Sequence, residues 1–386
     1  MKHASVVIIG GGIMGASAAY HLAARGWKDV LVLDRAPRAG AGSTGRATGG
    51  FRAQFSTTVN VKLSLLAREK LLRFRDEVGV DPGYVQAGYL WLAGSERERE
   101  ILRGALGVQH AAGATQSYEA SRDEIATINP AASLEGILSG FFCPTDGFIS
   151  PLAILSGYVA AAERLGVRFE WDSEVAKIEH KGGRITHVVT KHHHFATDCV
   201  VDAAGPWAGD VATLAGANLP VTPLRRQVAA TVPQTVLPPN MPMTIWVRDQ
   251  FHLRVRDGRA LLLYPTPGIP GRPYDATLDT YWLDEVGAIA RQRLPVLTEV
   301  AIDPEASWGG LYEMTPDRHS VLGGAPECPN LFYIAGSSGH GVMHSTALGQ
   351  LLAEIMSDGH ATSLDVSALS PARFAAGVTT QAADVL

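Results

Sequence analysis

The stretch SVVIIGGGIMGASAAYHLAARG, residues 5–26, decides how this chain begins to fold. Residues 5–9 form a short β-branched run, which is typical of a strand buried on both faces. The alanine-rich residues after the glycines predict a helix, which Arg25 and Gly26 would end as a basic last turn and a glycine cap. Residues 29–34, DVLVLD, predict a second buried strand. The chain therefore opens with a strand, a helix and a parallel strand.

Three glycines between the first strand and the helix, Gly10, Gly12 and Gly15, have the spacing GxGxxG. The first allows a tight turn, the second lets the backbone approach a pyrophosphate, and the third lets helix and strand pack closely. The helix N-terminus would present free N–H groups to the phosphates. Asp34 follows Gly15 by 19 residues, where an acid would bind ribose hydroxyls. The pattern predicts a site for NAD or FAD; a packing turn without a ligand is the alternative.

The composition indicates a large globular protein. The 386 residues suffice for two or three domains, and 18% charged residues is below the roughly 25% of an average soluble domain. A net charge of −5 without a basic tail makes nucleic acid an unexpected partner. Three cysteines, Cys143, Cys199 and Cys328, are too far apart in sequence for a zinc pattern or a disulfide framework. We therefore expect a reduced, cytoplasmic compartment.

Two stretches, residues 3–24 and 328–353, lack Asp, Glu, Lys and Arg and are long enough to span a membrane. Both contain clusters of glycine in their middle, where glycine costs a helix about 1 kcal/mol per residue relative to alanine. The glycines also interrupt any signal-peptide core. We expect neither a membrane span nor a signal peptide.

The loop after the second strand, residues 39–52, is made largely of glycine and other small residues. Such a backbone-rich segment suits a cofactor that extends beyond the first βαβ unit, although a surface loop is the simpler alternative. Arg46 and Arg52 in this loop could bind a phosphate or a substrate carboxylate, or could be solvated.

Five ordered motifs carry a resemblance to the D-amino-acid-oxidase superfamily of flavoproteins. Within it, the chain most resembles the sarcosine oxidases, the dimethylglycine and sarcosine dehydrogenases, and the β subunits of proline dehydrogenase and opine oxidase complexes. The resemblance extends from about residue 5 to 360 and does not specify a substrate. The motifs are VIIGGGIMGASAAYHLAARG (7–26), GSTGRATGGFR (42–52), VVDAAGPWAG (200–209), GGLYEMTPD (309–317) and AGSSGHGVMHS (335–345).

The resemblance implies an α/β fold, α+β overall, with two domains. A discontinuous Rossmann-like FAD-binding domain of the glutathione-reductase type would comprise residues 1–82, 145–220 and 318–386. A mostly antiparallel sheet, residues 83–144 and 221–317, would form a substrate-binding domain that roofs the flavin.

The resemblance also implies which residues bind FAD. Some would hold the ADP half, others would lie along the pyrophosphate and flavin, and the C-terminal glycine turn would line the pyrimidine edge of the ring. The residues are Gly10, Gly12, Ile13, Met14, Gly15, Asp34, Arg35, Ser43, Thr44, Arg46, Thr48, Gly49, Gly50, Val175, Ala204, Gly205, Trp207, Gly336, Gly339, His340, Gly341, Val342 and Met343. Packing in the core is the alternative for Trp207.

The C-terminal glycine turn has a physical argument of its own. Residues 331–335 predict a strand and residues 345–356 an amphipathic helix, with the glycines between them. A helix N-terminus that faces the flavin would stabilise negative charge on the reduced ring.

The reaction implied by the resemblance is oxidation of a C–N bond. A secondary, N-methyl or imino amino acid (sarcosine-, dimethylglycine- or proline-like) would give a hydride to flavin N5, and the imine would hydrolyse in water. The alternatives are a flavin-binding β-type subunit of a larger amine, opine or proline dehydrogenase complex, an enzyme like D-amino-acid or glycine oxidase, and an NAD-linked dehydrogenase. Partner subunits or a homo-oligomer remain open.

The candidate catalytic residues come from the loop, the roof and the C-terminal turn. Arg52 matches a family arginine that contacts the substrate carboxylate, and its planar fork suits that task. Histidines near the ring could hold the amine or favour its deprotonated form. The set is Arg52, His340, His344, His252, Tyr264 and His319.

Each of these candidates has a structural alternative. His340 could anchor the backbone of the turn, His319 could cap a strand, and His252 and Tyr264 could be ordinary sheet positions. Three consecutive histidines, residues 192–194, resemble a metal cluster, but neighbouring strand residues point to opposite faces. We expect a solvated hairpin there and no metal.

Departures from the family pattern bear on the cofactor and the substrate. Gly310 stands where monomeric sarcosine oxidase has its flavin-linked cysteine, and Arg46 where dimethylglycine dehydrogenases have a flavin-linked histidine, so we expect non-covalent FAD. No lysine follows Lys191, which removes the family's oxygen-activating lysine. Met343 and Tyr312 replace other carboxylate-binding residues of the family. These departures favour a dehydrogenase or a slow oxidase, with Arg52 as the main carboxylate ligand.

Overall fold

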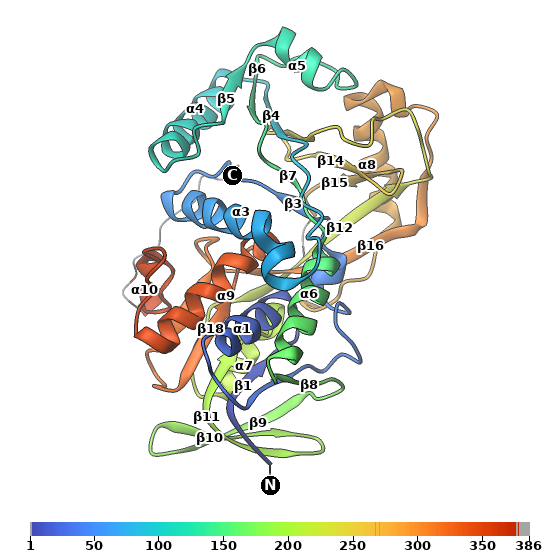
Figure 1. The fold of residues 1–386 in the computed structure, drawn as a ribbon. Helices are drawn as coiled ribbons and strands as arrows, with labels where there is room; N and C mark the ends of the chain where they lie inside the picture. Colours follow the sequence, from blue (N-terminus) through green and yellow to red (C-terminus); the bar gives the residue numbers. More distant parts are fainter. Residues whose placement is uncertain (1, 267, 270, 376, 378–386) are drawn as a thin grey trace.

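The computed structural model describes residues 2–266, 268–269, 271–375 and 377, which form two large sheets (Figure 1). The first sheet has the strand order β17-β18-β11-β1-β2-β8, with the hairpin β9–β10 attached to β11. Its strands are β1 (Lys2–Ile9), β2 (Val30–Leu33), β8 (Arg168–Glu170), β9 (Val175–Lys181), β10 (Arg184–Thr190), β11 (His194–Asp202), β17 (Val321–Gly324) and β18 (Leu331–Ala335).

Five consecutive strands of this sheet, from β18 through β11, β1 and β2 to the edge strand β8, run parallel, as the opening strand–helix–strand unit predicts. Because both faces are covered, β2 is buried at every position. One face packs against a group of helices in the middle of Figure 1, and α7 (Ala208–Leu214) packs on the other. The helix group is α1 (Ile13–Ala24), α3 (Thr58–Val78), α6 (Pro151–Arg164) and α9 (Gly341–Asp358).

The second sheet lies above these helices and has the order β16-β12-β15-β14-β13-β4-β6-β5 (Figure 1). All neighbours are antiparallel except β13 and β4. Its strands are β4 (Tyr89–Ala93), β5 (Tyr118–Ala120), β6 (Ser139–Cys143), β12 (Thr222–Thr231), β13 (Met243–Trp246), β14 (His252–Arg256), β15 (Arg259–Leu263) and β16 (Ile302–Met314).

Helices cover both faces of the second sheet. The helix α8 (Thr280–Arg293) buries Trp282 and Val286 against one face, and α4 (Glu96–Ala111) buries Leu102 against the other. The remaining short elements are α2 (Ser43–Arg46), β3 (Gly50–Phe51), α5 (Arg122–Ile128), β7 (Gly147–Phe148), η1 (Gly205–Trp207), η2 (Pro295–Leu297), η3 (Ser367–Leu369) and α10 (Ala372–Ala375).

The mixed fold predicted from the sequence is confirmed. Strands of the first sheet come from residues 1–82, 145–220 and 318–386, and those of the second from residues 83–144 and 221–317. We propose that these ranges are the two domains. Within that division, residues 1, 267, 270, 376 and 378–386 lie outside the described part of the chain.

The described residues can be searched for membrane-spanning helices and for metal-binding clusters. No helix among them combines the length and the apolar character needed to cross a bilayer. No cluster of three or more His, Cys, Asp or Glu among them could hold a metal ion. His192 and His193 lie in the turn between β10 and β11, and His194 is the first residue of β11; His192 and His194 are exposed.

Candidate active site

A cavity of about 780 Å³ lies between the two sheets. Its walls come from the β1–α1 turn, the loop after β2, the turn after β11 and the C-terminal glycine turn on one side. Strands β12, β14, β15 and β16 of the second sheet close the other side. This volume lies in the usual range for ligand pockets.

Two glycines of the β1–α1 turn have no room for a side chain. At Gly10, which has a φ of +109°, a Cβ would lie 2.3 Å from the carbonyl oxygen of Ala203. At Gly15 it would lie 1.9 Å from the carbonyl oxygen of Gly10, so this glycine lets α1 approach the turn. Gly12 is different, because a Cβ there would meet only the Thr44 hydroxyl, at 3.5 Å, on the cavity wall. The turn is therefore closely packed at Gly10 and Gly15, and at Gly12 it leaves room for a ligand in the cavity.

Asp34 fixes the shape of this turn. Its two carboxylate oxygens accept the backbone N–H groups of Gly11 at 2.6 Å and of Ala36 at 2.7 Å. Since each carboxylate oxygen can accept a second hydrogen bond, Asp34 retains the capacity to bind ribose hydroxyls. Ile13, Met14, Arg35 and Val175 line the cavity as well.

Trp207 is held as a flat wall of the cavity. The guanidinium of Arg35 lies 3.7 Å from the centre of its ring, and Tyr274 stacks on the ring at 5.5 Å with an interplanar angle of 13°. Trp207, Ala204 and Gly205 all line the cavity. The side chain therefore has a packing role and a position suited to a cofactor contact.

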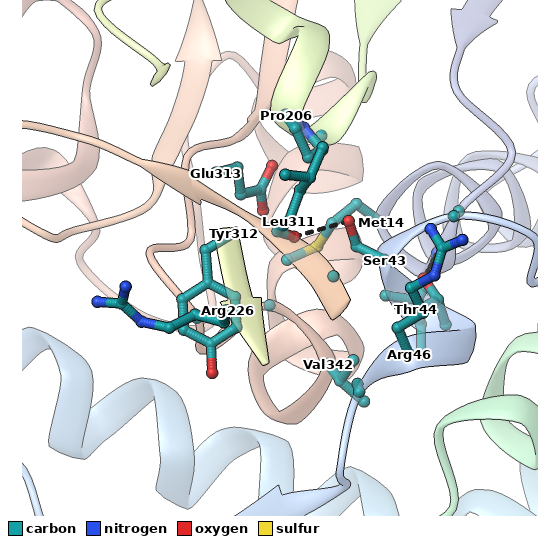
Figure 2. A pocket seen from close by; sticks show the side chains of 18 of the residues that line it. Met14, Ser43, Thr44, Arg46, Pro206, Arg226, Leu311, Tyr312, Glu313 and Val342 are labelled. Carbon is teal, nitrogen blue, oxygen red and sulfur yellow. Dashed lines mark hydrogen bonds between the residues drawn. The ribbon is translucent and has the colours of Figure 1, made fainter. Parts of the chain in front are cut away.

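The loop after β2 is fastened to both sheets. The Thr44 hydroxyl accepts the N–H of Ile13 at 3.1 Å. The Ser43 hydroxyl donates to the carbonyl of Leu311 at 2.8 Å (Figure 2). From the second sheet, Trp308 donates to the carbonyl of Arg46 at 2.8 Å, and Arg254 donates to the carbonyl of Thr48 at 2.6 Å. Arg254 also binds the carbonyl of Gly49, and Gly50 is a cavity residue. Trp308 and Arg254 were not among the residues predicted from the sequence.

The C-terminal glycine turn reaches the cavity at the N-terminal end of α9. Gly339, His340, Gly341, Val342 and Met343 line the cavity. A Cβ at Gly339 would lie 2.6 Å from the Tyr312 ring, so only glycine lets the turn lie against this tyrosine. Gly336 differs from the prediction, because it packs against Thr315 and does not line the cavity; a Cβ there would lie 2.5 Å from the Thr315 side chain.

Glu313 is a cavity residue that sequence reasoning missed, although it stands inside the motif of residues 309–317. One carboxyl oxygen accepts the N–H of Ser337 at 3.2 Å, and the other is buried with no hydrogen-bond partner among the described residues. Figure 2 shows the Glu313 side chain in the cavity wall. Burial raises the pKa of Glu313 to about 7. Burial raises the pKa of the nearby Asp202 carboxyl well above its usual value, and the charge of Glu313 adds to that rise.

These observations fit FAD. An open glycine turn, an acid for ribose and an unpartnered buried carboxyl follow one another along a single cavity. The N-terminal end of α9 closes the same cavity farther along. All of the residues predicted to bind FAD line this cavity, except Gly15 and Gly336. The contact of each of these residues with FAD stays a prediction.

Arg52 lies at the far end of the cavity with only 7% of its surface exposed. Its guanidinium donates to the carbonyl of Gln54 and to Nε2 of His340 at 3.2 Å, and it lies 4.0 Å from the centre of the Phe55 ring. Burial lowers the pKa of Arg52 to about 10, so it stays charged at neutral pH. Among the described residues, it forms no ion pair with an acid.

Two of the candidate histidines line the cavity, and both are held neutral. His252 donates from Nδ1 to the carbonyl of Gln250 at 2.8 Å, which leaves Nε2 as an acceptor. Burial lowers its pKa to about 4. Burial also lowers the pKa of His340 well below its usual value. Tyr264 lines the same region. These three residues remain candidates for substrate contacts.

The other two histidines lie behind the wall. His344, one helical turn after His340, hydrogen-bonds the Ser64 hydroxyl of α3 at 2.9 Å and is 1% exposed. His319 donates from Nδ1 to the carbonyl of Asp317 at 2.7 Å and accepts from the Thr57 hydroxyl at 3.0 Å. Neither lines the cavity. The structure thus places them in the packing of the helices, away from a direct contact with substrate.

Sequence reasoning also missed Arg226 on β12. Its guanidinium donates to the carbonyl of Thr266 at 2.8 Å and lies 5.8 Å from the centre of the Tyr312 ring (Figure 2). Tyr89 and Trp91 of β4 complete an aromatic wall near Arg52. No local motif marks these residues, because the two sheets bring them together.

A largely parallel sheet with a glycine turn, a second, largely antiparallel sheet and a cavity between them are the architecture of a flavin-dependent oxidoreductase. The chain belongs to the DAO family of FAD dependent oxidoreductases, whose model matches residues 5–355. The resemblance stated from the sequence is thereby confirmed, and FAD is the cofactor.

Known proteins of this kind are similar over nearly the whole chain. FAD-dependent oxidoreductase domain-containing protein 1 of Xenopus laevis is 29% identical over 97% of this chain and 83% of its own. Mitochondrial dimethylglycine dehydrogenase of Rattus norvegicus is 27% identical over 98% of this chain, which spans 46% of that protein. L-proline dehydrogenase from P. horikoshii superposes with a TM-score of 0.89 at 27% identity, covering 98% of this chain and 100% of that one.

Proposed function

We propose that this enzyme oxidises the C–N bond of a secondary, N-methyl or imino amino acid. The observation that carries the proposal is the buried guanidinium of Arg52, which lines the cavity and forms no ion pair with an acid of the described residues. A carboxylate matches the fork of an arginine. The relatives named for dimethylglycine and proline, whose substrates are such amino acids, support the same substrate class.

Bound FAD supplies the acceptor for a hydride equivalent, and the chain itself has to orient the amine. Arg52 would bind the carboxylate and so fix the position of the α-carbon. The aromatic wall of Tyr89, Trp91 and Tyr312 excludes water from the bound substrate. The resulting imine would be hydrolysed in water.

The protonation state of the amine follows from the charges around it. A low-dielectric cavity and the positive charge of Arg52 both disfavour an ammonium group, so the substrate would bind as the neutral amine. The unprotonated Nε2 of His252 can accept an N–H bond from that amine. With a pKa of about 4, His252 orients the amine and does not act as a strong base.

The electron acceptor is part of the same proposal. No lysine follows Lys191 in the sequence, and the residues described as lining the cavity include none. This favours a dehydrogenase, with oxygen as a slow acceptor. Whether the chain works alone or as one subunit of a larger complex is decided by turnover of the purified chain.

The proposal is tested by turnover of the purified, FAD-loaded protein with an artificial electron acceptor. The panel is sarcosine, dimethylglycine, L-proline, D-proline and glycine, with glycolate and lactate as controls that carry a hydroxyl in place of the amine. We expect reduction of the acceptor with at least one secondary or tertiary amine and formation of its oxo or imine product. Turnover of the hydroxy acids without turnover of any amine would overturn the proposal.

A further inference from the structure

We infer that Asp146 is a positioning residue for the carboxylate site at Arg52: it holds the backbone beside Arg52, and the charge of its buried carboxyl sets how tightly Arg52 binds a substrate carboxylate. The inference rests on the proposed function, in which Arg52 is the ligand of that carboxylate. Asp146 does not line the cavity and is 0% exposed, so it acts through Arg52.

Asp146 lies beside the Arg52 segment because of the pairing between β3 and β7. These strands are antiparallel, with Phe51 opposite Gly147. Arg52 follows this pair on one strand, and Asp146 precedes it on the other. The Asp146 carboxyl reaches across, and its Oδ1 accepts the backbone N–H of Ala53 at 2.9 Å. The residue directly after Arg52 is therefore fixed by this side chain.

The same aspartate ties the Arg52 segment to the second sheet. The Asp146 carbonyl accepts the N–H of Gly88, just before β4, at 2.8 Å. The Asp146 N–H donates to the carbonyl of Cys143, on β6, at 3.3 Å. The guanidinium of Arg52 in turn donates to the carbonyl of Gln54, which belongs to the segment that Asp146 fastens. The position of the guanidinium thus depends on Asp146.

The second carboxyl oxygen of Asp146 is buried and has no hydrogen-bond partner among the described residues. The thiol of Cys143 lies near the carboxyl, but a thiol is only a weak donor. An ionised carboxylate with a single good hydrogen bond is unfavourable in such a place. Burial accordingly raises the pKa of Asp146 toward neutral pH.

Two positive charges, those of Arg68 and Arg52, act on this carboxyl and oppose the larger effect of burial on its pKa. Arg68, on α3, donates to the hydroxyl of Thr145 at 2.6 Å, next to Asp146 in the chain. The influence is mutual, because burial lowers the pKa of Arg52 and the charge of Asp146 is among the effects that raise it again. The charges of Asp146 and Arg52 therefore interact.

The other titratable groups around this pair keep their charge near neutral pH. Burial raises the pKa of the Cys143 thiol and of three tyrosines, so they stay neutral: Tyr84, Tyr89 and Tyr312. Burial lowers the pKa of His340 and His252, which also stay neutral. Among these described residues, Asp146 is the group whose charge changes near neutral pH.

The consequence is a coupling between proton binding and ligand binding. With Asp146 protonated, the full charge of Arg52 acts on a carboxylate in the cavity. With Asp146 ionised, part of that charge is compensated and the ligand is repelled. A bound carboxylate raises the pKa of Asp146 further, so binding takes up protons and the affinity falls as pH rises.

The test measures how tightly the FAD-loaded protein binds a carboxylate that it cannot oxidise as an amine. Cyclopentanecarboxylate has the ring size and the carboxylate of proline but no nitrogen, so it stays an anion from about pH 6 to 9. Calorimetry gives its dissociation constant across that range. We expect the constant to rise about five-fold or more with pH, because charges in a buried site are screened little by salt.

Replacements of Asp146 separate its charge from its hydrogen bond. Asp146→Asn keeps an oxygen for the N–H of Ala53 but cannot ionise. Its affinity should not change with pH, and at about pH 9 it should exceed that of the unmodified protein by about five-fold. Asp146→Ala also loses the hydrogen bond and should bind about three- to ten-fold more weakly than Asp146→Asn at every pH. A purely structural aspartate would not give tighter binding in Asp146→Asn.

Three further variants identify the titrating group. Glu313→Gln removes the acid of the cavity wall whose pKa burial raises to about 7, and the rise should persist in it. The rise should also persist in Asp123→Asn, at an exposed position. Arg68→Gln removes a positive charge and should move the rise to higher pH by about 0.5 to 1 unit, less than the 1–3 units of a directly paired charge. This shift tests the inference even if the Asp146 variants do not fold.

Three results would overturn the inference: a dissociation constant that does not change with pH in the unmodified protein, a rise that persists in Asp146→Asn, or a rise that Arg68→Gln leaves in place. If the carboxylate still binds in these cases and Arg52→Lys weakens it, the proposed function stands. No binding of cyclopentanecarboxylate at any pH would also overturn the inference, and turnover of the amine panel then decides the proposed function separately.

Discussion

The guanidinium of Arg52 and the imidazole of His340 are joined by a hydrogen bond of 3.2 Å between Nη2 and Nε2. Arginine can only donate, so Nε2 of His340 accepts and carries no proton. The low pKa of His340, caused first by burial and then by the charge of Arg52, agrees with this assignment. A histidine at the N-terminal end of α9 thereby orients the arginine that we propose binds the substrate carboxylate.

Replacing His340 tests this positioning role. His340→Leu should raise KM for the amine by about ten-fold, the equivalent of roughly one hydrogen bond to a charged group, with a smaller effect on kcat. His340→Gln should recover part of the loss, because its amide oxygen can accept from Arg52. Equal defects in the two variants would argue against a hydrogen bond as the cause. Steady-state kinetics with FAD content held equal make the comparison.

Arg52→Lys tests the carboxylate site itself. Lysine retains the charge but loses the planar fork, so we expect KM to rise by about 10- to 100-fold, corresponding to about 1.5–3 kcal/mol. Arg248→Lys, at an exposed position, is the matched control. If both variants have the KM of the unmodified protein, Arg52 does not bind the substrate.

The raised pKa of Glu313 predicts that the stability of the FAD-free protein depends on pH. Its folded-state pKa of about 7 lies above the ordinary 4.5, so between these values the folded state binds more protons and stability falls as pH rises. Glu313→Gln removes this effect and should gain stability relative to the unmodified protein from about pH 4.5 to 7, by at most about 1.4 kcal/mol per pH unit.

Chemical unfolding at a series of pH values measures this difference. Glu305→Gln, at an exposed position on the same strand, controls for the loss of one carboxyl group. A difference for Glu313→Gln that does not change with pH would show that the carboxyl is not protonated in the folded state.

The cofactor should be released on denaturation. Gly310 offers no side chain for attachment, and a Cβ there would lie 3.3 Å from Cβ of Arg46. We expect acid precipitation to leave all of the FAD in the supernatant, as measured by its visible absorbance. A yellow pellet after washing would mean a covalent link at another residue.

The C-terminal helix α10 is fastened by a buried ion pair. Arg373 donates to both carboxylate oxygens of Asp317, at 2.7 and 3.1 Å, and the two side chains are 6% and 0% exposed. Arg373→Ala leaves a buried carboxylate without a partner and should cost about 3–5 kcal/mol of unfolding free energy. The exposed control Arg291→Ala should cost less than about 0.5 kcal/mol. Similar small losses in denaturant unfolding would contradict this account.

Local motifs predicted the nucleotide end of the site. The spacing of Gly10, Gly12 and Gly15, and the distance to Asp34, depend on one continuous segment, and the structure has its strand–helix–strand there. The C-terminal turn was predicted for the same reason, except that Gly336 serves packing against Thr315.

The substrate end could not be predicted in the same way. Arg226 reaches the cavity through the pairing of β12 with β16, which are separated by about seventy residues, and Arg254 through β14. Nearness in sequence was also misleading: His344 is one turn from His340, but that turn places it against Ser64 in the core. Such contacts depend on how the sheets and helices pack.

The most direct test of the central claim is anaerobic spectroscopy of the FAD-loaded protein mixed with the panel of secondary, N-methyl and imino amino acids. The account predicts that the visible flavin absorption is lost with at least one of these amines, and that the corresponding hydroxy acids leave it unchanged. A protein whose flavin is reduced by dithionite but by none of the amines would contradict the account.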